Sequence, residues 1–276
     1  ARHVTRVRIH ESVTVIPARA FYNNRNIEEV GCHNRVKVVE EDAFDFCPSL
    51  RRIIMRGVKD VEGGAFSDCH ALTDVECDKL ERIRYGAFDG CESLGSINLP
   101  SAKIVEGAAF FECAALTNVK FGKELESIGN GAFWGCTSLE RITLPLKDGI
   151  ITADDIFRGC KKLTHVDLVE GAVLRDTIDA LLLEEWKNDM KDKLGAINHI
   201  LPTARAGGFY DVGEKALEVR RWIRSVLRNI IRYKAQHLSI LNEAATTLQH
   251  ALHQDIVFKN VLPFLELPSY TFEGED

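Results

Sequence analysis

The chain has 276 residues, of which 45% are hydrophobic, and a formal net charge of −6. This composition is typical of a globular protein, which excludes disordered and fibrous classes, and the acidic balance gives no global sign of binding to nucleic acid or an anionic membrane. No apolar run reaches the ~18 residues of a membrane-spanning helix, and the basic start of the sequence is interpreted as a processed or trimmed end rather than a signal peptide.

A repeat of about 22 residues runs through the first two thirds of the chain. Seven phenylalanines recur at steps of 22 to 24 residues, and six of them have a cysteine three positions later. The phenylalanines are Phe21, Phe44, Phe66, Phe88, Phe110, Phe133 and Phe157. The cysteines are Cys47, Cys69, Cys91, Cys113, Cys136 and Cys160. Three residues further on, a branched aliphatic residue opens an L-x-x-I-x-L pattern, as at Leu94, Ile97 and Leu99.

The pattern predicts one strand with a single buried face in each repeat, because apolar and polar side chains alternate. With the segment around Val7, the chain holds eight such strands. One repeat cannot bury its apolar side alone, so the repeats must stack, strand beside parallel strand, into a solenoid. Aliphatic residues five positions before each phenylalanine are expected to fill the opposite side of the core. They are Ile16, Val39, Val61, Ile83, Val105 and Ile128.

The phrase G-A-F-x-x-C-x-S-L-x-x-I-x-L-P, nearly whole at 86–100 and 131–145, resembles the BspA-type (Treponema-type) leucine-rich repeat. The resemblance covers roughly residues 4–168. It implies an α/β fold, a curved leucine-rich-repeat solenoid with parallel strands on its concave face, of a kind used mostly to bind proteins. The last repeat departs from the pattern, since Thr152 replaces the aliphatic residue and 145–151 carries an insertion.

Helical periodicity replaces the repeat after Val173, which divides the chain into a solenoid at 1–173 and a helical region with an acidic tail at 174–276. An amphipathic helix is expected over 176–199, where it would cover the open end of the solenoid. A second helix is expected over 213–253. At about 60 Å it must bend, pack along another helix, or project.

This C-terminal third is also similar to that of BspA-type proteins from diatoms and related algae. The similarity rests on three segments, which here begin at Trp222, Tyr233 and Lys259. It implies no assigned activity.

The cysteine column has two interpretations: a redox relay or metal array, and a buried ladder of small side chains. The buried ladder is favoured, because no C-x-x-C pair occurs and free cysteine packs as a small hydrophobe. Cys32 and Cys77 fall on inward strand positions of the same core. Unpaired thiols favour a reducing compartment, so an intracellular location, cytoplasmic or nuclear, is expected.

Motifs for catalysis and metal binding are missing from the sequence. There is no G-x-S-x-G, no Walker-type glycine loop, no G-x-G-x-x-G opening a helix and no H-E-x-x-H. The sequence therefore predicts a protein without catalytic residues, metal ligands or cofactor.

The outward strand positions form two candidate rows on the predicted concave face. Candidate partner-binding residues are Arg52, Asp74, Glu76, Ser96, Asn98, Asn118, Lys120 and Arg141. Early members alternate in charge, which suits a structural ladder of ion pairs, whereas the stretch from Asp74 to Lys120 becomes amide-rich, which suits hydrogen bonding to a partner. Both interpretations stay open.

A basic stretch on the second helix offers an alternative site. Steps of four align Arg220, Arg224, Arg228 and Arg232 along one side. They form either a site for an acidic partner, RNA phosphate or a membrane surface, or a solvated face, which could also pair with acidic residues of the solenoid or tail. The solvated face is favoured.

These observations predict a non-catalytic scaffold that binds a protein partner, of unknown identity, through the concave face, the C-terminal helices or both. The alternative is a nucleic-acid or acidic-surface binder that uses the arginine-rich helix 214–234. Oligomerisation through the C-terminal helices is a further expectation.

Overall fold

The computed structural model describes residues 4–169, 178–179, 181, 183–201 and 214–251. The chain divides into two compact units. Ala1–Val169 with Ile197–Arg220 form one, and Glu170–Ala196 with Arg221–Asp276 form the other.

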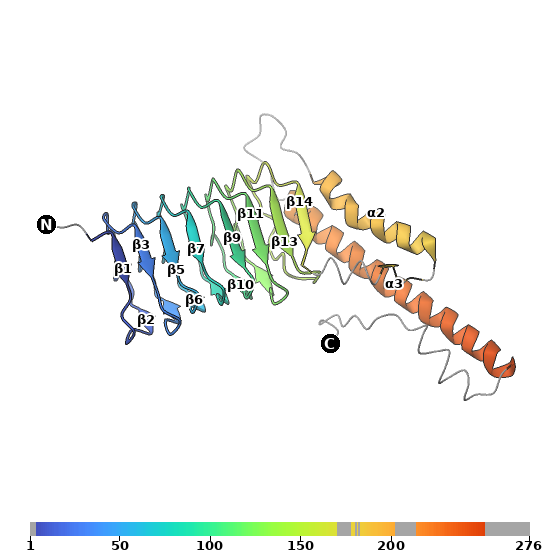
Figure 1. Cartoon of the computed structure of the whole chain (residues 1–276). Coiled ribbons are helices and arrows are strands. Elements are labelled where there is room, and N and C mark those ends of the chain that lie inside the picture. The colour runs from blue at the N-terminus through green and yellow to red at the C-terminus, as the bar shows by residue number, and fades with distance from the viewer. Residues whose placement is uncertain (1–3, 170–177, 180, 182, 202–213, 252–276) are drawn as a thin grey trace. The chain divides into compact units, whose positions relative to one another are not determined.

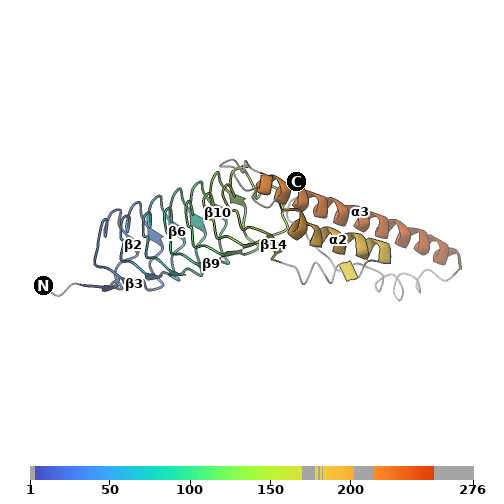
Figure 2. The same ribbon diagram turned by 90° about the horizontal axis from the view of Figure 1, so that it is seen from above.

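The first unit is a solenoid in which the coils give long strands to one side, and the first six coils also give a short strand to the other (Figure 1). The long strands are β1 (Arg6–Arg8), β3 (Glu29–Gly31), β5 (Arg52–Ile54), β7 (Asp74–Glu76), β9 (Ser96–Leu99), β11 (Asn118–Phe121), β13 (Arg141–Leu144) and β14 (His165–Leu168). The short strands are β2 (Val15–Ile16), β4 (Val38–Val39), β6 (Asp60–Val61), β8 (Arg82–Ile83), β10 (Ile104–Val105) and β12 (Ser127–Ile128). Figure 2 shows the long and short strands on opposite sides of the coils.

The strands are parallel and pair in chain order, which confirms the predicted solenoid. The short strands form one six-stranded sheet, and the long strands form two four-stranded sheets, β1-β3-β5-β7 and β9-β11-β13-β14. Alternation along β11 shows why the sequence takes this form: Val119 and Phe121 are buried, whereas Asn118 and Lys120 are exposed. The aliphatic residues expected on the opposite side lie in the short strands and are buried.

Stacked phenylalanines and a ladder of thiols fill the core at the turn between the short and long strands. Adjacent rings from Phe21 to Phe133 are nearly parallel, with centroids 4.9–5.3 Å apart. Each cysteine thiol of the column donates a hydrogen bond to the phenylalanine carbonyl of the preceding coil, as Cys113 does to Phe88 at 3.1 Å. Buried backbone acceptors need partners, so the cysteine column is a structural ladder.

The turn that precedes each stacked phenylalanine requires a left-handed backbone. Gly64 and Gly86 have φ of 62° and 61°, which glycine adopts without steric cost. The glycine of the G-A-F phrase therefore permits a tight turn at this point of the coil.

In the last coil, a neighbouring residue takes the core position at which the sequence has Thr152. Ile151 forms the backbone bridge to Ile128 that an aliphatic residue at position 152 was expected to make. Ile150 and Ile151 are both buried, and the Thr152 hydroxyl donates to the carbonyl of Ile128. The insertion thus shifts the pattern by one residue and keeps the core filled.

The second unit contains α2 (Glu184–Ile200) and most of α3 (Glu214–Ala251). The indole of Trp222 donates to the Lys193 carbonyl at 2.6 Å, and Asp189 accepts from Asn229 at 2.9 Å and from Tyr233 at 2.5 Å. The long helix therefore packs along another helix, one of the three expected outcomes. α2 begins at Glu184, later than predicted, and 170–177 lie outside the described residues.

The first turns of α3 belong to the solenoid unit and cap its last coil. Lys215 is buried, and its ammonium donates to the carbonyls of Cys160 and Leu163, each at 2.8 Å, and of Lys161 at 3.3 Å. The covering of this end by the helix expected at 176–199 stays a prediction. The contacts described here come from the start of the second helix.

Candidate functional site

The long strands bring the predicted outward positions into two rows, here called the strand face. In the first row, Glu29 pairs with Arg52 and Arg52 with Asp74, and in the second sheet Ser96, Asn118, Arg141 and His165 are in register. The second row lies two residues further along each strand. It includes Glu76, Asn98, Lys120 and Thr143. The predicted register is confirmed.

The part of the strand face over β1–β7 is covered by ion pairs within the chain. Arg52 pairs with Asp74 at 3.1 Å and with Glu76, and Arg56 also pairs with Glu76. The hydrogen bonds from Arg52 and then Arg56 hold the pKa of Glu76 below its usual value. Arg52, Asp74 and Glu76 therefore satisfy one another, as the structural interpretation of the alternating charges expects.

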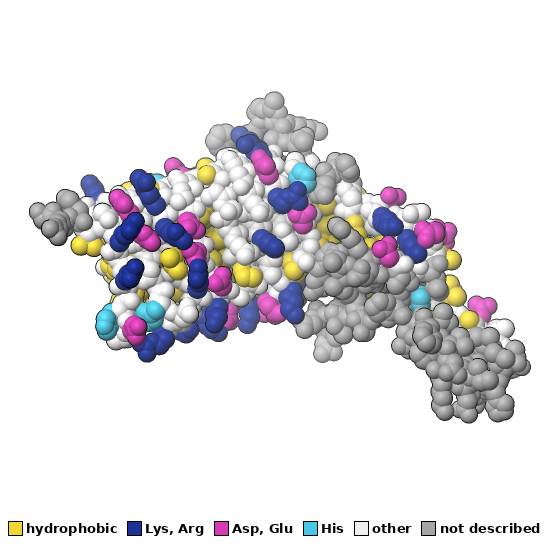
Figure 3. All heavy atoms as spheres, viewed as in Figure 1, with side chains coloured by type: hydrophobic (Ala, Val, Ile, Leu, Met, Phe, Trp, Pro, Cys, Tyr) yellow, Lys and Arg dark blue, Asp and Glu magenta, His cyan; other side chains and the backbone are white. Residues whose placement is uncertain are grey.

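The middle of the strand face, over β9 and β11, is different. Ser96, Asn98, Asn118 and Lys120 are exposed, and within the described part of the chain their side chains make no hydrogen bond or ion pair. In Figure 3, charged side chains gather over β1–β7, and the surface over β9–β13 is largely uncharged. At the far side Arg141 pairs with Asp167. The predicted residues thus separate into two ion-paired zones and an unpaired centre, here called the neutral patch (Ser96, Asn98, Asn118, Lys120).

The boundary of the neutral patch coincides with the gap between the two long-strand sheets. β7 and β9 lie next to each other in chain order but belong to different sheets. The thiol of Cys77 reaches across this gap to the carbonyl of Asn98 at 3.7 Å. The continuous short-strand sheet holds the coils together here.

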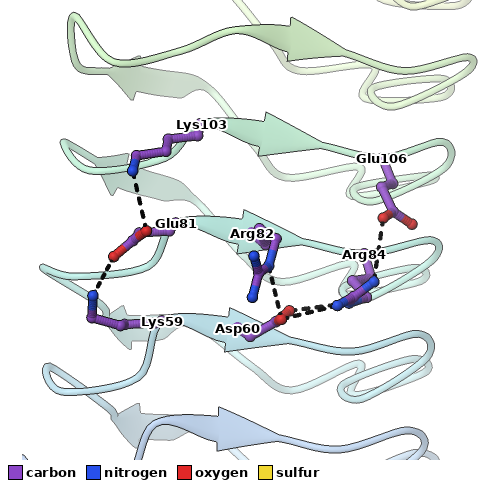
Figure 4. A network of polar contacts seen from close by, with 7 residues as sticks. All are labelled: Lys59, Asp60, Glu81, Arg82, Arg84, Lys103 and Glu106. Atoms are coloured by element: carbon purple, nitrogen blue, oxygen red, sulfur yellow. Dashed lines mark hydrogen bonds and ion pairs between the residues drawn. The ribbon is translucent and has the colours of Figure 1, made fainter.

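A buried carboxylate on the short-strand side was not anticipated from the sequence. Asp60 is 5% exposed and accepts hydrogen bonds from Arg82 Nε at 2.9 Å and from Arg84 Nε and Nη2 at 3.1 and 3.0 Å (Figure 4). The hydrogen bond to Asp60 raises the pKa of Arg84 above its usual value. Arg84 also reaches Glu106 on the next coil at 3.8 Å.

A second bridge lies beside the first in Figure 4, where Glu81 sits between Lys59 at 2.6 Å and Lys103 at 3.3 Å. The hydrogen bonds from Lys59 and Lys103 lower the pKa of Glu81. Both bridges connect successive coils and satisfy their own charges, so this cluster is a structural clamp. The spacing of 22 residues between Asp60 and Arg82 is the signal that could have predicted it.

The arginine row of α3 is largely engaged within its own unit. Arg220 pairs with Asp154 at 2.9 Å and donates to the Ile151 carbonyl at 3.2 Å. Arg232 lies over the Tyr233 ring at 4.5 Å, and Arg228 donates to the carbonyl of Arg224 at 3.2 Å. Arg220 thus forms an ion pair with an acidic residue of the solenoid, and no observation on the described residues supports a nucleic-acid site.

Comparison with known proteins identifies the family to which the repeats belong. The profile of the family described as "BspA type Leucine rich repeat region" matches residues 1–104 and 81–176 with six copies. The chain belongs to the BspA-type leucine-rich repeat family. No curated protein matches the chain significantly.

Solved structures similar to this BspA-type protein are bacterial. The T. pallidum leucine-rich repeat protein TpLRR is 24% identical, with a TM-score of 0.45 over 59% of this chain and 69% of that one. A leucine rich cell surface protein of Faecalibacterium prausnitzii is 22% identical, with a TM-score of 0.32 over 60% of each chain. A leucine-rich repeat protein from Bacteroides ovatus is 23% identical, with a TM-score of 0.31 over 60% of this chain and 61% of that one. The similarity of the C-terminal third to algal proteins stays a prediction.

The cysteine thiols of this BspA-type chain form no disulfides and are not exposed. All eight cysteines are free and buried, and among the described residues no group of three or more His, Cys, Asp or Glu is arranged to hold a metal ion. Burial raises the pKa of Cys32 and Cys77 to about 12 and raises those of Cys91, Cys113 and Cys136. Cys47 is the exception, because the neighbouring Cys69 thiol lowers its pKa.

We expect none of the eight thiols to react with a maleimide in the native protein at neutral pH, and all eight to react in denaturant. Burial excludes the reagent from all eight thiols, and in six of them a raised pKa also suppresses the thiolate that attacks it. Mass spectrometry of timed samples measures the number of labels. Rapid native labelling, at Cys47 above all, would show that the coils open locally and would contradict the buried ladder.

Proposed function

We propose that the chain is a non-catalytic scaffold that binds a protein partner through the strand face, centred on the neutral patch. BspA-type repeat proteins in general are protein-interaction scaffolds. The observation that supports this proposal is the contrast on one face: Ser96, Asn98, Asn118 and Lys120 are exposed without a partner in the described chain, between zones whose charges are satisfied.

The neutral patch has the chemistry of a recognition surface. Its strands hold the backbone in place, so few conformations are lost when a partner binds. Two amides and a hydroxyl both donate and accept hydrogen bonds, and Lys120 supplies one unpaired cation. The flanking residues Arg52, Asp74, Glu76 and Arg141 are proposed to form the rim, where charges steer association more than they add affinity.

Eight unpaired thiols support a cytoplasmic or nuclear location, which stays a prediction, as does oligomerisation through the C-terminal helices. Among the described helices, none is both long and apolar enough to cross a membrane.

A matched pair of variants tests the proposal by affinity capture from native cell extract. The first carries Asn98→Ala, Asn118→Ala and Lys120→Ala, and the second carries Arg52→Ala, Asp74→Ala and Glu76→Ala. We expect the first to lose a specific partner by at least about tenfold, about 1.4 kcal/mol, because it removes groups that are free to bind. The second is expected to retain most of the capture.

Circular dichroism and the unfolding midpoint show that both variants remain folded, since neither touches an inward residue. Equal capture by the parent and the neutral-patch variant would remove the strand face as the binding site. Greater loss in the ion-pair variant would move the site to β5–β7.

A further inference from the structure

A second surface lies along the turns, away from the strand face. It is formed by the two residues that follow each stacked phenylalanine, here called the turn edge. These pairs are Tyr22–Asn23, Asp45–Phe46, Ser67–Asp68, Asp89–Gly90, Phe111–Glu112 and Trp134–Gly135. Backbone hydrogen bonds hold the coils in register here, for example from Phe46 to Ser67 at 3.0 Å and from Asp68 to Asp89 at 2.8 Å.

Aromatic side chains stand at one end of the turn edge. Tyr22 and Phe46 are 45% and 47% exposed, and their rings meet edge to face at 6.3 Å. The guanidinium of Arg19 lies 5.4 Å from the centre of the Tyr22 ring. Aromatic residues with this exposure are typical of the anchor positions of protein interfaces.

Phe46 also has a backbone that does not suit it. Its φ is 55°, and every later coil also has a positive φ at this position, at Asp68, Gly90, Glu112, Gly135 and Gly159. A bulky side chain in the left-handed region is strained, and here the aromatic ring faces solvent instead of the core. The positive φ is therefore set by the coil, whereas the exposed ring does not fill the core and is available for contact with another molecule.

Carboxylates on consecutive coils fill the middle of the turn edge. They are Asp45, Asp68, Asp89 and Glu112. Within the described residues no lysine or arginine pairs with any of them, and His70 lies 4.0 Å from Asp68. Asp45 is 9% exposed, and its Oδ1 is buried without a hydrogen-bond partner.

Burial, together with repulsion from neighbouring carboxylates, raises the pKa values of Asp45 and Asp89. Burial, followed by the charges of Asp42 and Asp68, raises the pKa of Asp45 to about 6. Burial, followed by the charges of Asp68 and Glu112, raises the pKa of Asp89 to about 6. The row therefore carries negative charge that no lysine or arginine of the described chain pairs with, and His70 beside Asp68 is the histidine that lies against it.

A second aromatic pair closes the far end. The rings of Phe111 and Trp134 are 5.7 Å apart, and the Arg158 guanidinium lies 4.2 Å from the Trp134 ring centre. This cation over an indole shows that the aromatic group accepts guanidinium contacts.

The four carboxylates are spread along the row and do not converge on one point. No three of these groups are arranged to hold one metal ion, which favours a partner whose cations are also spread out. Five steps of about 4.8 Å between coils give roughly 24 Å, a length that about seven extended residues cover.

We propose that the turn edge binds an extended basic segment of a partner protein, with apolar or arginine side chains over the two aromatic pairs and lysine or arginine side chains over the carboxylates between them. This surface is distinct from the neutral patch. Binding at the turn edge would give the scaffold a partner with a basic segment, and it does not depend on the strand face.

Fluorescence anisotropy with a labelled ten-residue peptide of alternating Arg and Leu tests the proposal on the full chain, beside a matched peptide of alternating Glu and Leu. We expect the basic peptide to bind and the acidic peptide not to bind. Asp68→Asn, Asp89→Asn and Glu112→Gln together are expected to weaken binding by at least roughly tenfold.

The control removes the same number of charges elsewhere, by Glu28→Gln, Glu124→Gln and Glu140→Gln, and is expected to change affinity less than about threefold. An equal loss in both triple variants would show attraction to net charge alone and overturn the proposal. The neutral-patch variant should bind the basic peptide as the parent does. Its failure would instead assign the peptide to the strand face.

Phe46→Gly separates binding from folding. Glycine relieves the left-handed backbone, so the unfolding midpoint is expected to rise or stay unchanged while affinity for the basic peptide falls several-fold. Unchanged affinity together with a higher midpoint would show that Phe46 is merely strained, and would remove the aromatic part of the proposal.

Acidification gives an independent readout. Asp45 faces Asp42 and Asp68, and Asp89 faces Asp68 and Glu112, with His70 and Arg19 as the nearby cationic groups. Carboxylates with raised pKa values lose charge as the pH falls through about 6, so affinity is expected to fall between pH 7.5 and 5. Affinity that holds constant over this range would contradict a site built on these carboxylates.

Discussion

Replacing Phe88 by alanine is expected to lower the free energy of unfolding by about 3–5 kcal/mol, the usual cost of deleting a buried aromatic ring. The Phe88 ring is fully buried and stacks on Phe66 at 5.2 Å and on Phe110 at 5.3 Å. Its loss leaves a cavity between two rings that backbone hydrogen bonds hold in place. Because each coil contacts only its neighbours, a defect in the fourth repeat also weakens the coupling between the two halves of the stack.

Urea unfolding followed by circular dichroism measures this effect. Tyr85→Ala is the control, since it removes an aromatic ring from the same coil but at a side chain that is 68% exposed. We expect the control to change stability by less than about 0.5 kcal/mol. A Phe88→Ala protein as stable as this control would mean that the stack relaxes around the cavity and that the phenylalanine column is not what holds the coils together.

The repeat period made most of the solenoid predictable. Residues that recur at the same position in every coil predict the strands, their register, the phenylalanine stack and the burial of Cys32 and Cys77. These features are predictable because the same repeat unit occurs seven times. The same period predicted which side chains point outward. It could not predict which of these are free, because Arg52 and Arg56 both reach Glu76 through long side chains whose geometry no periodicity encodes.

Departures from the period were harder to interpret. Thr152 looked like a worn position at the end of the solenoid, whereas Ile151 takes its place in the ladder. Asp60 and Arg82 stand at equivalent positions of neighbouring repeats, yet their pairing depends on burial that sequence alone does not show. The turn edge was invisible for a different reason: its residues vary from coil to coil, and the repeat pattern draws attention only to what stays the same.

The role of Lys215 could not be foreseen, because on the sequence it counts as one of several basic residues on a helix. In the structure its buried ammonium donates to three carbonyls at the end of the last coil. Lys215→Met is expected to lower the free energy of unfolding by about 3 kcal/mol. Methionine keeps the apolar stem and removes an ammonium that is costly to bury, but it leaves three carbonyls without this donor, at about 1–3 kcal/mol for each unsatisfied group.

Hydrogen exchange locates the effect as well as measuring it. We expect faster exchange at the amides of β13 and β14 in Lys215→Met, and little change over β1–β5, since a solenoid transmits a terminal defect mainly to adjacent coils. Lys234→Met makes the same change at an exposed position of the same helix and should leave exchange in the solenoid unaltered. The amides of β14 could instead exchange equally slowly in both variants. In that case the apolar contacts of Ala216 and Val219, which are fully buried, would be sufficient to hold α3 on the last coil. The lysine would then be a specificity element that sets where the helix begins its contact, without contributing to the stability of the end it covers.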